Sequence, residues 1–63
     1  MRWYLIAKQF EGEPEPEIRL GRWTEAARRN HQRHGWSVIG RWPLQPTNTR
    51  VHETIFNYTK EQS

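Results

Sequence analysis

The apolar run at residues 3–7 most constrains the fold of this 63-residue chain. Its sequence, WYLIA, does not alternate with polar residues. An uninterrupted apolar run of this length is typical of a strand that is covered on both faces. We therefore predict a strand over residues 2–10 (RWYLIAKQF), with other elements packed against both of its sides.

A chain this short forms a single domain, residues 1–63, and it buries only roughly 60% of the surface of its unfolded form. The absence of cysteine excludes disulfide bonds and cysteine-ligated zinc sites. Four tryptophans, two tyrosines and two phenylalanines can supply the core, because each large aromatic side chain buries on the order of 150–250 Å². The composition therefore predicts a small folded domain that depends on aromatic packing.

An acidic, proline-rich segment, EGEPEPE at residues 11–17, follows the first strand. Its prolines remove backbone donors and its glutamates place like charges two residues apart, which predicts a solvated hairpin loop. Residues 17–20 then alternate between polar and apolar, so we predict a second strand with Ile18 and Leu20 directed inward.

The segment 24–34 carries the signals of both ends of a helix. Thr24 is a favourable N-cap, and Glu25 suits the positive end of the helix dipole. Gly35 is a favourable residue after the helix because it adopts positive φ without steric cost. We therefore predict a short helix from Thr24 to His34.

Two further strands are predicted after this helix. In residues 36–44 (WSVIGRWPL), an alternating pattern places Trp36, Val38 and Trp42 on one face, and Pro43 should end the strand. Residues 51–58 (VHETIFNY) follow a turn-forming connector and are rich in branched and aromatic residues, which favours a fourth strand.

The resulting order is β-β-α-β-β, an α+β fold with one short helix packed on a small, mainly antiparallel sheet. Residues 59–63 are expected to form a flexible tail. The apolar content of residues 51–58 exceeds what one helix can cover. It is therefore compatible with a homodimer formed by edge-to-edge pairing of this strand.

Basic residues predominate outside the acidic loop. The net charge of the chain is +3, and the loop holds four of the seven acidic residues. The remainder has ten lysines and arginines against three acidic residues, a balance of +7. Such an asymmetry favours an acidic partner, namely DNA, RNA or an acidic protein surface.

The predicted helix divides its residues between two faces, at about 100° per residue. One face should pack on the sheet, and it consists of Ala26, Ala27, Asn30, His31 and His34. The other face should point outward, and it consists of Glu25, Arg28, Arg29, Gln32 and Arg33. Guanidinium groups bind phosphates in bidentate fashion, and a glutamine amide can pair with a base edge. We therefore predict a small, basic, non-enzymatic nucleic-acid-binding regulator, whose contact residues are Arg28, Arg29, Arg33, Gln32, Arg22 and Arg41.

The alternative is a small inhibitor or adaptor that docks on a host protein. Exposed aromatic and acidic residues would then carry the contact, because aromatic side chains dominate many protein interfaces. The residues expected to do so are Glu13, Glu15, Trp42 and Tyr58. A very small, basic, tryptophan-rich chain without cysteine is also typical of phage and mobile-element accessory proteins.

The sequence gives little support for catalysis or metal binding. His31, His34 and His52 lack the cysteine or carboxylate that would complete a metal site, so no metal and no cofactor are expected. His52 and Glu53 would face opposite sides of a strand, which separates them as an acid–base pair. The apolar run is too short for a signal or membrane segment, so we expect a cytoplasmic location and no membrane partner. No motif identifies a family.

Overall fold

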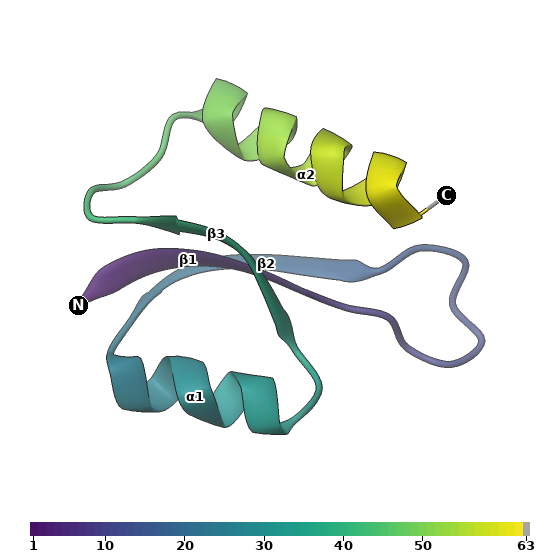
Figure 1. Ribbon diagram of the computed structural model, residues 1–63, viewed down its shortest axis with the longest axis horizontal. Coiled ribbons are helices and arrows are strands. Elements are labelled where there is room, and N and C mark those ends of the chain that lie inside the picture. Colours follow the sequence, from purple (N-terminus) through teal and green to yellow (C-terminus); the bar gives the residue numbers. More distant parts are fainter. Residues whose placement is uncertain (63) are drawn as a thin grey trace.

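The structure, a computed structural model, describes residues 1–62. It contains three strands and two helices (Figure 1). The element order is β-β-α-β-α, so the predicted α+β class is confirmed, whereas the predicted fourth strand is wrong. The elements are β1 (Arg2–Lys8), β2 (Glu17–Trp23), α1 (Glu25–Arg33), β3 (Ser37–Trp42) and α2 (Asn48–Gln62).

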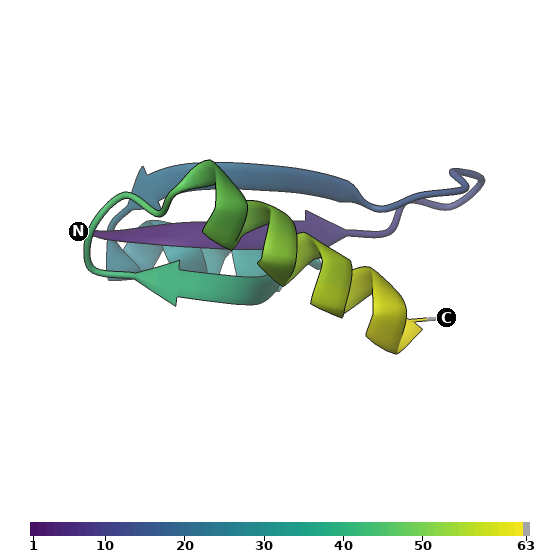
Figure 2. The same ribbon diagram turned by 90° about the horizontal axis from the view of Figure 1, so that it is seen from above.

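The three strands form one antiparallel sheet in the order β2-β1-β3. Because β1 runs antiparallel to both neighbours, the edge strands β2 and β3 run parallel to each other. The connection from β2 through α1 to β3 is therefore a crossover that skips over the central strand. Helix α1 lies on one side of the sheet and α2 on the other, which gives three layers (Figures 1 and 2). We call these sides the α1 side and the α2 side.

The apolar run of β1 forms the centre of the molecule. Tyr4, Leu5, Ile6 and Ala7 are each at most 2% exposed, which confirms that this strand is covered on both faces. Successive side chains of a strand point to opposite faces. Tyr4 and Ile6 accordingly lie on the α1 side, where they form a core cluster with Trp36.

A bulge in β3 changes the side on which its residues lie. Leu5 pairs with Gly40, but Ile6 pairs with Val38, so Ile39 is an extra residue in β3. Val38 therefore packs on the α1 side, while Trp42 pairs with Trp3 on the α2 side. The prediction that Trp36, Val38 and Trp42 share one face is wrong, because the bulge interrupts the alternation on which it depends.

Helix α1 begins and ends as predicted. The hydroxyl oxygen of Thr24 accepts a hydrogen bond from the backbone N–H of Ala27 at 3.2 Å. Gly35 has φ +91°, and its N–H donates to the carbonyl of Gln32 at 3.1 Å. Lys8 Nζ donates to the carbonyl oxygen of His34 at 2.6 Å, so β1 contributes a cation at the negative end of α1.

Helix α2 replaces the predicted strand because its apolar residues also fit a helical repeat. The half-buried residues Val51, Thr54, Ile55 and Tyr58 follow the spacing i, i+3, i+4, i+7. Thr47 caps the helix, since its hydroxyl oxygen accepts from the N–H of Arg50 at 3.2 Å.

This helix also changes two further expectations. The edge-to-edge dimer expected through residues 51–58 has no strand there to form it. Residues 59–62, expected to be a flexible tail, continue α2, and Ser63 lies outside the described residues.

Each edge strand ends in the same triplet, Gly-Arg-Trp, at residues 21–23 and 40–42. In both, the indole ring lies over the glycine two residues earlier. A Cβ atom at Gly21 would stand only 2.6 Å from Cε2 of Trp23, and a Cβ atom at Gly40 would stand 2.8 Å from Cζ3 of Trp42. The two rings lie on opposite sides of the sheet, because Trp23 packs in the α1-side core and Trp42 pairs with Trp3 on the α2 side.

Candidate nucleic-acid interface

Positive charge is concentrated on the α1 side of the sheet. The strand register and α1 together place seven of the ten basic residues there with two glutamates, a formal charge of +5. The loop between β1 and β2 carries −3, and the remaining charged residues, on the α2 side, sum to +1. The basic residues of the α1 side are Arg2, Lys8, Arg19, Arg28, Arg29, Arg33 and Arg41.

Arg28 is turned toward the sheet, so its predicted outward orientation is wrong. Its side chain is only 16% exposed, and Nη2 lies 2.5 Å from Oε1 of Glu25. Its Nη1 donates a hydrogen bond to Oε1 of Gln32, and its buried Nε has no partner among the described residues. The hydrogen bond to Glu25 raises the pKa of Arg28, with a smaller contribution from Tyr4, while burial opposes the rise. Arg28 is therefore an internal counter-ion.

The outward face of α1 consists of Ala26, Arg29, Asn30 and Arg33, all of which are exposed. The prediction that Ala26 and Asn30 pack on the sheet is therefore wrong, because the half-buried stripe of the helix is formed by Ala27, Arg28 and His31. The side chains of Arg29, Asn30 and Arg33 make no hydrogen bond or salt bridge to any other described residue. Arg29 does act at a distance, because its charge contributes to lowering the pKa of Glu25. Since α1 forms an outer layer of the molecule (Figure 1), this face is open to a partner.

One arginine from each edge strand flanks α1. Arg41 of β3 pairs with Tyr4 and holds its guanidinium 5.7 Å from the centroid of that ring. Arg19 of β2 lies 4.9 Å from the ring of Trp36 and 3.5 Å from the carboxylate of Glu17. These cation–π contacts keep both cations beside the helix.

The predicted contact residues are therefore only partly brought together. Arg29, Arg33, Gln32 and Arg41 belong to the α1 side, where Gln32 is exposed and uses its oxygen to accept from Arg28. Arg22 pairs with Trp3 and lies on the α2 side. The predicted contact residues omit Arg19, because the sequence does not show that α1 covers the face of β2 on which Arg19 lies.

The histidines differ in environment. His31 is half-buried, and its Nδ1 donates to the carbonyl oxygen of Ala27 at 2.8 Å. Its ring lies 4.6 Å from that of Trp23 and packs edge-on to Trp36. His31 is therefore a packing residue, as predicted, whereas His34, predicted on the same face, is exposed at the end of α1. Among residues 1–62, no three histidine, aspartate or glutamate side chains are grouped so as to hold a metal ion.

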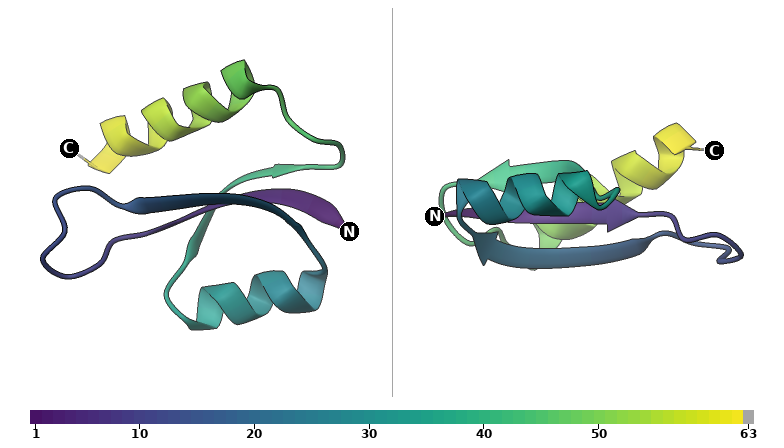
Figure 3. Two further views of the ribbon diagram at one scale, coloured as in Figure 1. Left: turned by 180° about the vertical axis from the view of Figure 1, so that it is seen from behind. Right: turned by 90° about the horizontal axis from the view of Figure 1, so that it is seen from below.

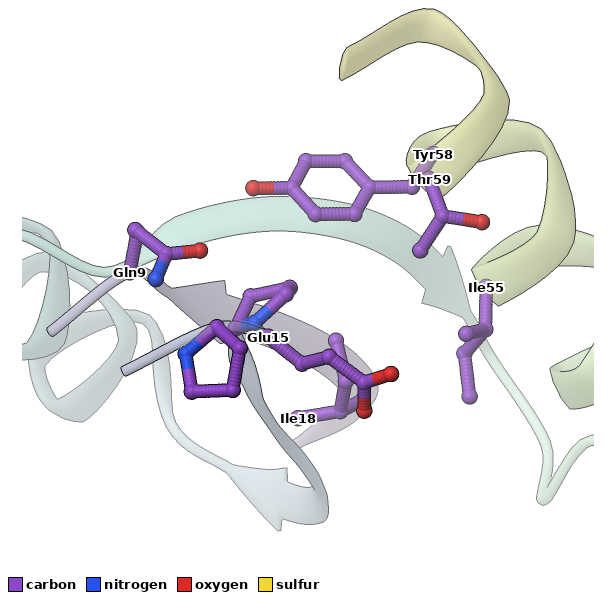
Figure 4. Close-up of a pocket in the computed structure, with 8 residues that line it drawn as sticks. Gln9, Glu15, Ile18, Ile55, Tyr58 and Thr59 are labelled. Atoms are coloured by element: carbon purple, nitrogen blue, oxygen red, sulfur yellow. The ribbon is translucent and has the colours of Figure 1, made fainter. Parts of the chain in front are cut away.

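The residues predicted for protein docking do not form one continuous surface. Glu15 and Tyr58 line one groove of about 580 Å³ between the loop and α2, in which Tyr58 extends toward Gln9 (Figure 4). Glu13 lines a neighbouring hollow, and half-buried Trp42 lies across Gly40 on β3. The aromatic residue that is most exposed on α2 is instead Phe56, at 65%.

The comparisons with known proteins give no relative. No protein-family description matches the chain, and neither the curated proteins nor the solved structures contain a significant match. Within residues 1–62, neither helix has the length and apolar character needed to cross a membrane.

Proposed function

We propose that this protein binds nucleic acid through the α1 side of its sheet. The observation that most supports this proposal is the segregation of charge: the α1 side carries +5, and the side chains of Arg29 and Arg33 make no hydrogen bond or salt bridge to another described residue. Arginine pairs with phosphate in bidentate fashion, and neutralising phosphates releases counterions. Phosphate contact is the interaction that this surface favours most.

Arg28 supports this role indirectly. Glu25 is the one acidic residue of α1, and its carboxylate would repel a phosphate. The ion pair with Arg28 neutralises that carboxylate within the helix. Arg29 and Arg33 lie one turn apart, where side chains i and i+4 are neighbours. They can therefore act together on a phosphate backbone.

The test is a binding titration against short labelled DNA and RNA at several salt concentrations, followed by fluorescence anisotropy. Each neutralised phosphate adds roughly −0.9 to the slope of log K against log salt for duplex DNA. The double variant Arg29→Glu/Arg33→Glu should abolish binding at moderate salt. The matched double variant Arg22→Glu/Arg50→Glu, on the α2 side, should retain most of the affinity. Equal losses in both variants would contradict the proposal.

A second candidate function is docking on a basic segment of another protein. Glu15 and Tyr58, from the loop and α2, line the same groove, and among residues 1–62 no lysine or arginine lines it. The probe is a set of immobilised basic peptides that each contain an aliphatic residue, and the measurement is the retention of the protein on them. Retention that is lost in Glu15→Lys and in Tyr58→Ala, but kept in Arg29→Glu, would support this candidate. Retention that survives both groove variants would eliminate it.

A further inference from the structure

The outward face of α1 has the side chains that recognise base pairs. Arginine pairs with the O6 and N7 acceptors of guanine, and asparagine pairs with the N6 and N7 atoms of adenine. Arg29, Asn30 and Arg33 make no hydrogen bond or salt bridge through their side chains within residues 1–62. Ala26 completes this face, and its small side chain allows a close approach of the helix backbone to a partner.

The shape of the α1 side suits a groove rather than a flat surface. Helix α1 has nine residues, a length of about 13 Å. It is the one helix on this side of the sheet, as the view from below shows (Figure 3, right). The Cα positions of residues 1–62 lie within 32 × 28 × 14 Å, and the view down the shortest axis shows the three layers edge-on (Figure 1). The α1 side is therefore a narrow ridge, and the major groove of B-DNA, about 12 Å wide, admits a helix.

Other forms of nucleic acid fit this side less well. The major groove of A-form RNA is deep and narrow, so side chains cannot reach its bases. Single strands are bound by stacking of bases on exposed aromatic rings. On the α1 side, Tyr4 and Trp36 are buried, and half-buried Trp23 contacts Tyr4 and His31. Phe10 is 38% exposed, and its ring packs edge-on against Trp36. Each of these rings is therefore engaged with another ring of the protein.

From these observations, and resting on the proposed nucleic-acid binding, we infer that α1 enters the major groove of double-stranded DNA. Arg29, Asn30 and Arg33 contact base edges there. Arg19 and Arg41, on the two edge strands beside the helix, contact the phosphates that border the groove on each side. The base contacts of α1 then give the sequence preference, and the phosphate contacts of the edge strands give most of the affinity that does not depend on sequence.

The inference is tested first with three probes of one sequence: duplex DNA, duplex RNA and single-stranded DNA. The expected result is that duplex DNA binds at least about tenfold more tightly than the other two, because only its groove admits the helix. Equal or tighter binding of either other probe overturns the inference and leaves the proposed function standing. If none of the three probes binds, the proposed function fails as well.

The second test is selection from a pool of random-sequence DNA duplexes. The wild-type protein should enrich a short preferred site, and Asn30→Ala should lose the preference at a single base pair. Arg41→Ala should weaken binding to all sequences alike, and Arg22→Ala should change neither property. Circular dichroism of each variant establishes that it folds. A pool without enrichment, or an Asn30→Ala profile identical to that of the wild type, overturns the inference.

Discussion

Nη2 of Arg28 lies 2.5 Å from Oε1 of Glu25, three residues earlier in α1. This pair determines which arginines of the helix are available to a partner. Arg28 is drawn along the helix toward the sheet, where only 16% of its side chain is exposed. The outward positive charge of α1 therefore comes from Arg29 and Arg33.

The ion pair predicts a specific response to acid. The hydrogen bond and charge of Arg28 lower the pKa of Glu25 below its ordinary value of 4.5, with smaller contributions from Arg29 and Arg41. A lowered pKa in the folded state means that ionised Glu25 stabilises the fold above pH 4.5. This contribution disappears as the pH falls through the lowered pKa. Glu25→Gln should be less stable than the wild type at neutral pH, and the difference should vanish in acid.

Urea unfolding at a series of pH values, followed by tryptophan fluorescence, measures this difference. Glu53→Gln is the control, because Glu53 is exposed on α2 and makes no ion pair within the described residues. If the free energy of unfolding of Glu25→Gln stays below that of the wild type by the same amount at low pH, the ion pair is not the source of the difference.

The glycine of the β2 triplet should not tolerate a side chain. A Cβ atom at Gly21 would stand within 2.9 Å of three atoms of the Trp23 ring. That ring is stacked with Tyr4 at a centroid distance of 6.5 Å and lies 4.6 Å from the ring of His31, which limits its movement. Gly21→Ala should therefore destabilise the fold by about 1–3 kcal/mol, as overpacking does.

Chemical denaturation of Gly21→Ala, Trp23→Leu and the double variant measures this effect. If the clash is its cause, the loss in the double variant will be smaller than the sum of the two single losses, because the smaller leucine side chain leaves room for the Cβ atom. Strict additivity would rule out the clash as the cause.

His31 and His34 offer a matched comparison of packing. His31 contacts Trp23 and donates to the carbonyl oxygen of Ala27, whereas His34 is exposed at the end of α1. His31→Ala should cost about 1–3 kcal/mol through the lost ring contacts and hydrogen bond. His34→Ala should change the free energy of unfolding by less than about 0.5 kcal/mol, as most surface substitutions do. Equal effects would place His31 outside the core.

The cap of α2 tests the helical assignment of residues 51–58. Thr47→Ala removes the hydroxyl that accepts from the N–H of Arg50, and it should cost about 1 kcal/mol. Thr49→Ala is the matched variant, because Thr49 lies inside the first turn and its side chain makes no hydrogen bond to the described residues. Thermal unfolding of the two variants, followed by the far-ultraviolet circular dichroism signal of helix, compares their stabilities. If Thr47→Ala is as stable as Thr49→Ala, the cap does not form.

The sequence predicts the elements from β1 to β3 well, because their signals are local and mutually consistent. The apolar run of β1, the alternation at the start of β2 and the caps Thr24 and Gly35 each specify one conformation. Residues 51–58 do not, because their half-buried residues have the branched and aromatic character of a strand and also the spacing of a helix. The packing of α2 against β3 is the tertiary contact that accompanies the helical form.

The candidate site was predictable as a region rather than as a set of residues. A helical projection places Arg28 and Arg29 together, but it does not give the direction of the sheet. Arg28 lies at the flank of the half-buried stripe, so only the position of Tyr4 and Glu25 turns it inward. Arg19 and Arg22 are three residues apart on β2, so strand alternation places them on opposite sides of the sheet, but the sequence does not show which of these sides α1 covers.

The bulge at Ile39 means that β3 spans six residues of chain but matches only five positions of β1. A deletion of Ile39 would restore regular pairing and leave Arg41 and Trp42 on their present sides. Deletion of Gly40 would restore the same pairing, but it would bring an isoleucine beneath the Trp42 ring, where even a Cβ atom has no room. Tolerance of β3 to a shorter chain is thus confined to the residues before Gly40, and length variation among natural homologues should be found there.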